Sequence, residues 1–196
     1  MTYATLDVAR PIWDRFLWVS PLVVVGTVEE GGGIDLAPKH MATPLGWDNY
    51  FGFVCTPRHA TYRNALREGS FAVSYPTPDQ LVHASLAAEP RCDTGEKVAM
   101  AALPTVSGDR VPAPLLRDAY LHLECALERI VDGFGVNALI VGRIVAARVR
   151  EDALRHTERS DQELIATSPL IAYLPPGQYA HIDATHDFPL PEGFTR

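Results

Sequence analysis

The sequence has few cysteines, and their number and spacing exclude two common kinds of architecture. Its 196 residues include only Cys55, Cys92 and Cys125. An odd number of widely separated cysteines gives neither a disulfide framework nor a CxxC metal-binding pattern. The cysteine content therefore favours a reducing compartment.

Long apolar runs and a positive charge balance are also missing. No apolar segment reaches 18 residues, and the N-terminal stretch MTYATLDVARPIWDRF lacks the basic start and apolar run of a signal peptide. The formal net charge of −7 argues against nucleic acid or an anionic membrane as the main partner, because a negatively charged surface attracts neither. We therefore predict a cytoplasmic protein with no membrane and no nucleic-acid partner.

The usual catalytic and nucleotide-binding motifs are absent as well. The chain contains no GxGxxG, no GxxxxGK[ST], no HExxH and no GxSxG. With 196 residues and 47% hydrophobic composition, the chain is large enough to bury a full core. We expect one domain over residues 1–196, with 186–196 as a proline-rich C-terminal tail.

What the sequence does contain is a series of short β-branched and aromatic runs separated by turns. Glycine-rich turns at EEGGG and DGFG indicate two hairpins. Gly142 inside the last strand indicates a strand that bends or that meets another backbone closely. In the strand before DGFG, a polar face carries His122, Glu124 and Glu128. Strands are predicted over 20–28, 34–37, 50–56, 70–75, 119–131 and 137–149, and short helices over 56–69 and 78–88. This pattern favours a closed antiparallel β-barrel, with an α+β sandwich as the alternative.

The segment TPRHATYRNALREG, residues 56–69, predicts a helix whose start attracts negative charge. Thr56 is the expected N-cap, Pro57 suits the first turn, and Gly69 suits the left-handed position after the last turn. Tyr62, Ala65 and Leu66 are expected on the packing face.

The start of this predicted helix also carries polar side chains suited to an anion. Arg58, His59 and Thr61 join unpaired backbone N–H groups and the helix dipole there, so a phosphate would fit. The alternative is an ordinary capped surface helix with solvated side chains.

A second polar cluster, DLAPKHMATPLGW at 35–47, follows a predicted strand. Its prolines keep the backbone out of regular pairing, so Lys39, His40 and Thr43 could line a ligand, or the segment could be a surface loop. A metal site at His40, Cys55 and His59 lacks a fourth nearby ligand. A Cys55 nucleophile activated by His59 has little support, because a spacing of four residues across a strand-to-helix turn does not ensure that the two side chains meet. We predict no metal.

Together these segments resemble the flavin reductase-like, FMN-binding split-barrel family. The resemblance runs in order through PLVVVGTV, DLAPKH, TPRHATYRNALREGSFAVSY, GEKVAMAAL, AYLHLEC, LIVGRIVAARV and YLPPGQYAHI. It implies a mainly β fold, an antiparallel Greek-key split β-barrel with short inserted helices, which binds FMN and forms a homodimer. It also implies an FMN-dependent oxidoreductase that takes electrons from NAD(P)H and passes them to flavin or another acceptor.

The resemblance also implies which residues hold the cofactor. Residues 38–43 would line the isoalloxazine and ribityl groups, and residues around the helix start would hold the phosphate. The expected cofactor-binding residues are Pro38, Lys39, His40, Met41, Ala42, Thr43, Thr56, Arg58, His59, Ala60 and Thr61. No catalytic residue is assigned, because the cofactor carries the redox chemistry.

Three positions depart from the family pattern. Asp35 stands where the family often has Asn, and His40 stands where it often has Ser. The sequence GVN at 135–137 stands where many NADH-using members have a GDH-like motif. This last departure favours the alternative hypothesis of a flavoredoxin-like electron-transfer module that binds FMN but is reduced by a protein partner.

Overall fold

The computed structural model describes residues 1–93, 95–155 and 158–194, and most of them belong to short strands. The helical segments are α1 (Ala60–Glu68), η1 (Pro78–Gln80), α2 (Leu81–Leu86), η2 (Val98–Ala102), η3 (Glu151–Ala153) and α3 (Asp161–Thr167). The strands are β1 (Ser20–Pro21), β2 (Val23–Val28), β3 (Ile34–Lys39), β4 (Ala42–Pro44), β5 (Tyr50–Cys55), β6 (Ser70–Tyr75), β7 (Thr105–Ser107), β8 (Pro114–Leu116), β9 (Leu121–Phe134), β10 (Asn137–Val149), β11 (Leu170–Leu174) and β12 (Gln178–Ile182).

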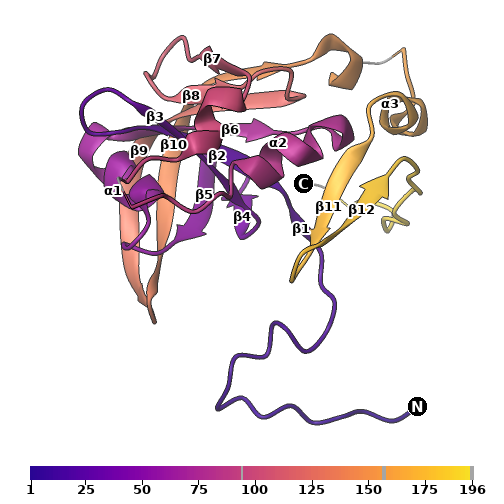
Figure 1. The fold of residues 1–196 in the computed structure, drawn as a ribbon. Coiled ribbons are helices and arrows are strands. Elements are labelled where there is room, and N and C mark those ends of the chain that lie inside the picture. Colours follow the sequence, from indigo (N-terminus) through magenta and orange to yellow (C-terminus); the bar gives the residue numbers. More distant parts are fainter. Residues whose placement is uncertain (94, 156–157, 195–196) are drawn as a thin grey trace.

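Seven of these strands form one curled antiparallel sheet (Figure 1). Their order is β3-β2-β6-β9-β10-β5-β4, so β3 and β4 are the two edges. No pairing joins these edges within the part of the chain that the structure describes, and the chain passes from one to the other through His40 and Met41. The closed barrel expected from the strand pattern is therefore open between β3 and β4, and the mainly β split barrel implied by the resemblance is confirmed.

The concave side of the sheet buries the main hydrophobic core. Side chains from β2, β5, β6 and β10 meet there, and the rings of Phe53 and Phe71 pack edge to face with centroids 5.1 Å apart. Gly142 on β10 lies against this pair, because an added Cβ would come within 2.5 Å of the Phe71 ring. The close approach expected at Gly142 is thus to a side chain, and a larger residue there would displace the ring.

Helix α1 begins three residues later than the sequence predicted. Thr56 closes a turn instead of capping the helix: its carbonyl accepts the N–H of His59 at 3.0 Å, and its hydroxyl accepts that of Arg58 at 3.5 Å. His59 occupies the N-cap position without a side-chain hydrogen bond. Gly69 has a φ of 62°, which confirms the left-handed helix end.

The packing face of α1 also differs in part from the expectation. Ala65 is buried and Tyr62 packs on the core, but Leu66 is 56% exposed. Its place is taken by two polar residues, Thr61 and Asn64, of which Asn64 donates a 3.1 Å hydrogen bond to the hydroxyl of Thr27. The helix is therefore fixed to β2 by a buried polar contact that hydrophobic periodicity does not reveal.

The long hairpin of β9 and β10 is confirmed, but one of its polar residues lies inside. Glu124 was expected on the polar face of the strand with His122 and Glu128, yet it is only 1% exposed. Its carboxylate accepts the backbone N–H groups of Asp109, Arg110 and Val111 at 3.1, 2.6 and 2.9 Å. A buried carboxylate thus fixes the turn between β7 and β8.

Several short elements were not predicted from sequence. Strands β4, β7, β8, β11 and β12, together with helix α3, lie in stretches whose apolar runs are too short to show a period. The predicted helix over 78–88 is present as η1 followed by α2. The tail has no helix or strand over 186–194, and its residues 195 and 196 lie outside the described part of the chain.

Strands β11 and β12 form a second small sheet with β1, beside the end of α2 (Figure 1). The N-terminal arm, residues 1–19, extends away from the body of the molecule before entering β1. Among the described residues, no helix is both long enough and apolar enough to cross a membrane.

The Glu124 contact generates a prediction about stability. Burial raises the pKa of Glu124, but the hydrogen bonds from Arg110, Asp109 and Val111 outweigh it, so the folded-state pKa is lowered. We expect Glu124→Gln to reduce the free energy of unfolding by about 1–3 kcal/mol at pH 7, the scale of a buried charged hydrogen-bond acceptor.

This stabilisation belongs to the ionised group, so it is present above the unfolded pKa of about 4.3 and is lost as pH falls through the lower folded value. Urea denaturation at pH 7 and at stepwise lower pH measures the effect, with the exposed Glu128→Gln as control. Equal midpoints for the wild type and Glu124→Gln at pH 7 would contradict the account.

Candidate functional site

Two adjoining cavities lie along the end of edge strand β3. The first, named here the polar pocket, has a volume of about 450 Å³, and the second, the aromatic pocket, about 380 Å³. They share Pro38, Lys39 and Ala88, so they are neighbours. The polar pocket is lined by Asp35, Ala37, Pro38, Lys39, Arg58, His59, Ala60, Thr61, Arg63, Ala87, Ala88, Glu89, Pro90, Arg91 and Lys97. The aromatic pocket is lined by Leu22, Pro38, Lys39, His40, Leu81, Ala84, Ser85, Ala88, Tyr173, Gly177, Gln178 and Tyr179.

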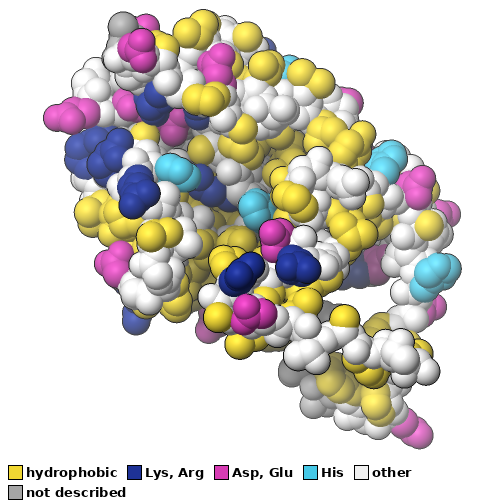
Figure 2. Space-filling view, turned by 60° about the horizontal axis from the view of Figure 1, so that its bottom comes forward, with side chains coloured by type: hydrophobic (Ala, Val, Ile, Leu, Met, Phe, Trp, Pro, Cys, Tyr) yellow, Lys and Arg dark blue, Asp and Glu magenta, His cyan; other side chains and the backbone are white. Residues whose placement is uncertain are grey.

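The polar pocket concentrates positive charge in an acidic protein. Five cationic side chains line it against two carboxylates, whereas the whole chain has a formal net charge of −7. Figure 2 shows a face of the molecule on which Lys and Arg side chains gather beside a histidine at the edge of a hollow. A local excess of positive charge in a concave site attracts an anion.

A network of ion pairs fixes one wall of the polar pocket. The ammonium of Lys97 donates to Asp35 Oδ1 at 2.9 Å and to the backbone carbonyls of Leu36 and Ala87 at 2.7 and 2.8 Å. Arg91 lies 3.3 Å from Asp35 and also pairs with Glu29. Because Asp35 is only 2% exposed, this carboxylate ties the segment 87–97 to β3 through a largely desolvated contact.

Lys39 differs from Lys97 because its charge is not neutralised in this way. Among the described residues, no hydrogen bond or ion pair to its ammonium is found. Burial lowers the pKa of Lys39, although nearby Cys55 and Asp35 act in the opposite direction. A partly desolvated ammonium without an acceptor is a ready partner for a bound anionic oxygen.

The start of α1 forms the opposite wall. Its first-turn N–H groups have no partner within the helix, and Ala60 and Thr61 from this turn line the pocket. Arg63 folds back over the turn and donates to the carbonyls of Arg58 at 2.7 Å and Pro57 at 3.4 Å. First-turn backbone N–H groups, Thr61 and two arginines thus line one pocket, which suits a phosphate.

Behind this wall lie a thiol and an imidazole. Cys55 is buried, and its Sγ lies 3.9 Å from Nδ1 of His59, so the two side chains do meet. Burial raises the pKa of Cys55 and lowers that of His59, which keeps both neutral at pH 7. No group of three or more side chains suited to a metal ion occurs in residues 1–93, 95–155 and 158–194.

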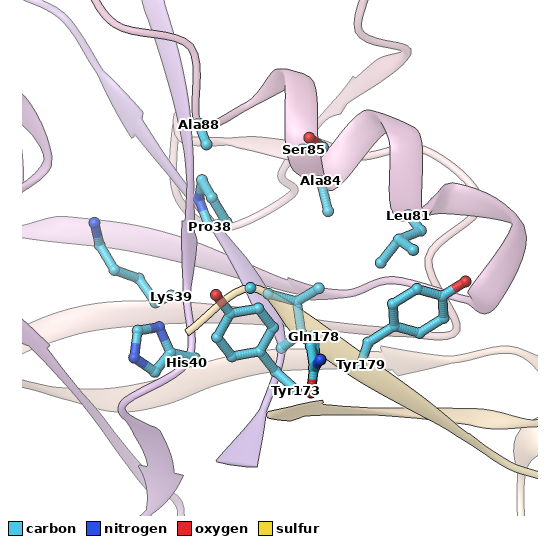
Figure 3. A pocket seen from close by; sticks show the side chains of 12 residues that line it. Pro38, Lys39, His40, Leu81, Ala84, Ser85, Ala88, Tyr173, Gln178 and Tyr179 are labelled. Carbon is cyan, nitrogen blue, oxygen red and sulfur yellow. The ribbon is translucent and has the colours of Figure 1, made fainter. Parts of the chain in front are cut away.

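The aromatic pocket lies between α2 and the hairpin of β11 and β12. Figure 3 shows the rings of Tyr173 and Tyr179 on the hairpin side and Leu81, Ala84 and Ser85 on the α2 side. Apolar walls with a few polar groups are typical of a site for a planar organic molecule. A molecule with an anionic end and a planar end could therefore occupy both pockets, lying along Pro38 and Lys39.

The structure brings together seven of the eleven residues predicted to bind a cofactor. Six of them, Pro38, Lys39, Arg58, His59, Ala60 and Thr61, line the polar pocket, and Pro38, Lys39 and His40 line the aromatic pocket.

The other four predicted residues line neither cavity. Ala42 packs in the core, Met41 is 40% exposed, and the Thr43 hydroxyl donates to the carbonyl of Pro44. Thr56 lines a third hollow with Pro57, Arg58 and the tip of the β9–β10 hairpin. Their assignment to the cofactor therefore stays a prediction.

Sequence reasoning missed the pocket residues that come from distant segments. Arg91 and Lys97 were not singled out, and neither were Tyr173, Gln178 and Tyr179. Lys97 lies in GEKVAMAAL and the tyrosines in YLPPGQYAHI, two of the segments that carried the resemblance. A charged residue in a proline- and glycine-rich stretch gives no local sign of where it will lie.

A family model for the flavin reductase-like domain matches residues 17–173, which contain both walls of the polar pocket and Tyr173. The chain belongs to the flavin reductase-like family. The split-barrel fold and the cationic pocket agree with this flavin-protein family, and the family match covers most of the chain.

Solved structures of other proteins share the fold of this chain. A 2-nitrobenzoate 2-nitroreductase of Pseudomonas fluorescens has 17% identity, with a TM-score of 0.80, covering 100% of this chain and 99% of that one. An FMN-binding protein of Thermus thermophilus has 23% identity and a TM-score of 0.75, covering 96% and 99%. The flavoredoxin of Desulfovibrio vulgaris (Miyazaki F) has 19% identity and a TM-score of 0.73, covering 97% and 98%. At these identities the likeness shows the fold alone.

The geometry of the α1 wall predicts which side chains hold a flavin phosphate. We expect Arg58→Ala and Thr61→Ala each to weaken binding of added FMN by roughly 1–3 kcal/mol, or about 5- to 150-fold in Kd, because each would remove a donor to a phosphate bound at this wall. Titration by flavin fluorescence measures this. Arg110→Ala, which removes an exposed arginine outside the pocket, and Thr61→Ser, which keeps the hydroxyl, are the controls. Unchanged affinity in both alanine variants would place the phosphate elsewhere.

Proposed function

We propose that this protein binds FMN, with the phosphate in the polar pocket and the ring system in the aromatic pocket. The observation that carries the proposal is the pairing of the two cavities along Pro38 and Lys39. FMN ends in a phosphate monoester whose charge at pH 7 is close to −2. The excess of cations in the polar pocket suits that charge, and the aromatic walls suit a flat ring.

The residues present fit this cofactor in chemical type. Arg58, the Thr61 hydroxyl and the first-turn N–H groups of α1 would donate to the phosphate. Lys39, whose ammonium has no acceptor within the described residues, would add positive charge between the phosphate and the ring. Lys97 and Arg91 are already engaged by Asp35, so their role is to hold the wall in place.

We infer an FMN-dependent oxidoreductase that uses NAD(P)H and reduces free flavin or another acceptor. Bound FMN would supply the redox chemistry, and the protein supplies binding, orientation and exclusion of water. The aromatic pocket lies between the hairpin and α2 (Figure 3), and a second molecule would have to approach a ring held there. The solved reductases that share the fold are consistent with this function.

A second candidate is an electron-transfer module that binds FMN and is reduced by a protein. The observation that favours it is the GVN sequence at 135–137 in place of a GDH-like motif. Gly135, Val136 and Asn137 lie at the hairpin tip and line a hollow with Arg58, a residue of the polar pocket. This hollow lacks the histidine of the GDH-like motif, and a flavoredoxin shares the fold.

The same proposal includes a homodimer. The N-terminal arm and the hairpin tip expose large apolar side chains that a lone chain would leave in water. These are Tyr3, Val8, Trp13, Phe16, Leu17, Val19, Val131, Phe134 and Val136. A second copy packed on these surfaces would bury them, and the arm extends away from the body of the molecule (Figure 1).

Flavin uptake and reduction test the cofactor and the donor separately. The purified protein is expected to show flavin absorbance, or to gain it on titration with FMN, and to release FMN on denaturation. Stopped-flow mixing with NADH or NADPH should then bleach the bound flavin. Uptake without bleaching by either nucleotide would support the electron-transfer module. A protein that takes up no FMN would overturn both candidates.

The dimer is tested by sedimentation equilibrium at micromolar protein. We expect a mass twice the 21.5 kDa of one chain. A variant that replaces Phe134 and Val136 by serine should shift the equilibrium toward the single chain, because it removes apolar contact area. A wild-type protein that sediments as one chain at all concentrations would refute the dimer.

A further inference from the structure

His59 occupies the N-cap position of α1, with one ring nitrogen against the protein and the other unengaged. Its Nδ1 lies 3.9 Å from Sγ of Cys55, and that thiol donates to the carbonyl of Thr56 at 3.7 Å. Because the thiol hydrogen is used on Thr56, the sulfur presents a lone pair to the imidazole. This favours the tautomer with its hydrogen on Nδ1, since the partner of one nitrogen sets which nitrogen is protonated. Nε2 is then unprotonated, and it has no hydrogen-bond partner among the described residues.

The charged groups around this ring belong to the polar pocket that His59 lines. They come from β3, from the start of α1 and from the segment 87–97, and cations outnumber carboxylates among them. These groups are Asp35, Lys39, Arg58, Arg63, Glu89, Arg91 and Lys97. β5 adds the buried thiol of Cys55, and the hairpin tip adds Asp132, which accepts from Tyr62 of α1 at 3.2 Å. Imidazole is the side chain in this set whose ordinary pKa lies closest to neutral pH.

In the absence of a ligand, the surroundings of the ring keep it neutral. Burial lowers the pKa of His59 below its usual value near 6.5, and the charges of Lys39 and Arg63 lower it further. A phosphate dianion in the same pocket would oppose this effect, because its two negative charges would offset those of the cations. The coupling acts across the pocket and needs no direct contact between ring and phosphate. The pKa of His59 should therefore rise when a phosphate monoester binds.

We propose that His59 takes up a proton at Nε2 when the FMN phosphate enters the polar pocket, so that its imidazolium adds a positive charge that the empty pocket lacks. This rests on the proposed function, which places the phosphate in this pocket. The proton comes from solvent, no covalent bond of FMN changes, and Nδ1 keeps its contact with Cys55. His59 is thus a phosphate-binding residue whose contribution depends on pH, in contrast to the permanently charged Arg58.

The direction of the pH dependence follows from linkage between proton and ligand. Between the pKa of His59 in the free protein and its higher value in the complex, binding takes up a proton. FMN affinity therefore falls as pH rises through this range, by up to about tenfold in Kd per pH unit. Above the range the ring is neutral in both states, and its contribution is lost. Below about pH 6 the phosphate itself gains a proton, so affinity should be highest between these limits.

The test measures proton uptake by isothermal titration calorimetry at pH 7, with FMN added to flavin-free protein in PIPES and in Tris. These buffers differ in ionisation enthalpy, so the difference between the two apparent binding enthalpies gives the number of protons taken up. We expect between about 0.5 and 1 proton per FMN for the wild type and less than about 0.2 for His59→Gln.

Two further variants serve as controls for charge and for histidine content. His59→Arg keeps a permanent positive charge at this position, so it should bind FMN tightly without proton uptake. His181→Gln changes an exposed histidine on β12 outside the pocket, and it should take up as many protons as the wild type.

Two other measurements follow the same proton independently. In fluorescence titrations between pH 6.5 and 8.5, the Kd for FMN should rise about tenfold in the wild type and within about threefold in His59→Gln and His59→Arg. In NMR spectra of histidine-labelled protein, the imidazole signal that His59→Gln removes should titrate at a pKa about one pH unit or more higher with FMN than without it. The signal of His181 should not change.

The opposite outcomes overturn the proposal. Equal proton uptake by the wild type and His59→Gln would mean that another group, such as Lys39, takes the proton. An imidazole signal with the same pKa in both states would mean that the phosphate does not act on this ring. If the wild type takes up no FMN, the proposed function fails and this inference fails with it. If FMN binds without proton uptake, only the role of His59 is refuted.

Discussion

The free edge of β3 is the constraint on which the site depends. A barrel closed by hydrogen bonds between β3 and β4 would leave no room beside Pro38, but proline has no N–H to offer a neighbouring strand. A backbone group of this edge strand finds a partner outside the sheet, since the carbonyl of Leu36 accepts a hydrogen bond from the ammonium of Lys97. The segment that carries Lys97 and the helix α2 therefore cover the edge, and the cavities lie beneath them.

The ion pairs along this edge explain how an acidic protein can maintain a cationic pocket. Asp35 neutralises Lys97 and part of the charge of Arg91. This reduces the mutual repulsion of the cations that line the polar pocket when no ligand is bound. Lys39 and Arg58 are left without such a partner in the described chain, and their charge is available to a ligand. Asp35 thus holds Lys97 and Arg91 in structural ion pairs, whereas Lys39 and Arg58 keep their charge for a ligand.

The aromatic pocket joins parts of the chain that are far apart in sequence. The arm contributes Trp18, β3 contributes His40 and β11 contributes Tyr173, and their rings form one continuous series. His40 and Tyr173 line the pocket itself, so the shape of the pocket depends on how the small sheet packs beside the large one. The same arrangement brings a titratable imidazole to a ring site whose lining also includes Lys39 and two phenols.

The sequence by itself determined the main strands, the β9–β10 hairpin and the helix end at Gly69, because periodicity and glycine act over a few neighbouring residues. It also identified Arg58, His59 and Thr61 at the start of α1, which line the polar pocket. Local patterns could not place Thr56, which forms a turn instead of a cap, or Glu124, whose three donors lie on another segment. Only the tertiary structure decided that Lys97 and Tyr173 lie beside residues 38–40. Contacts between distant segments depend on burial and charge pairing, and these leave no periodic pattern in the sequence.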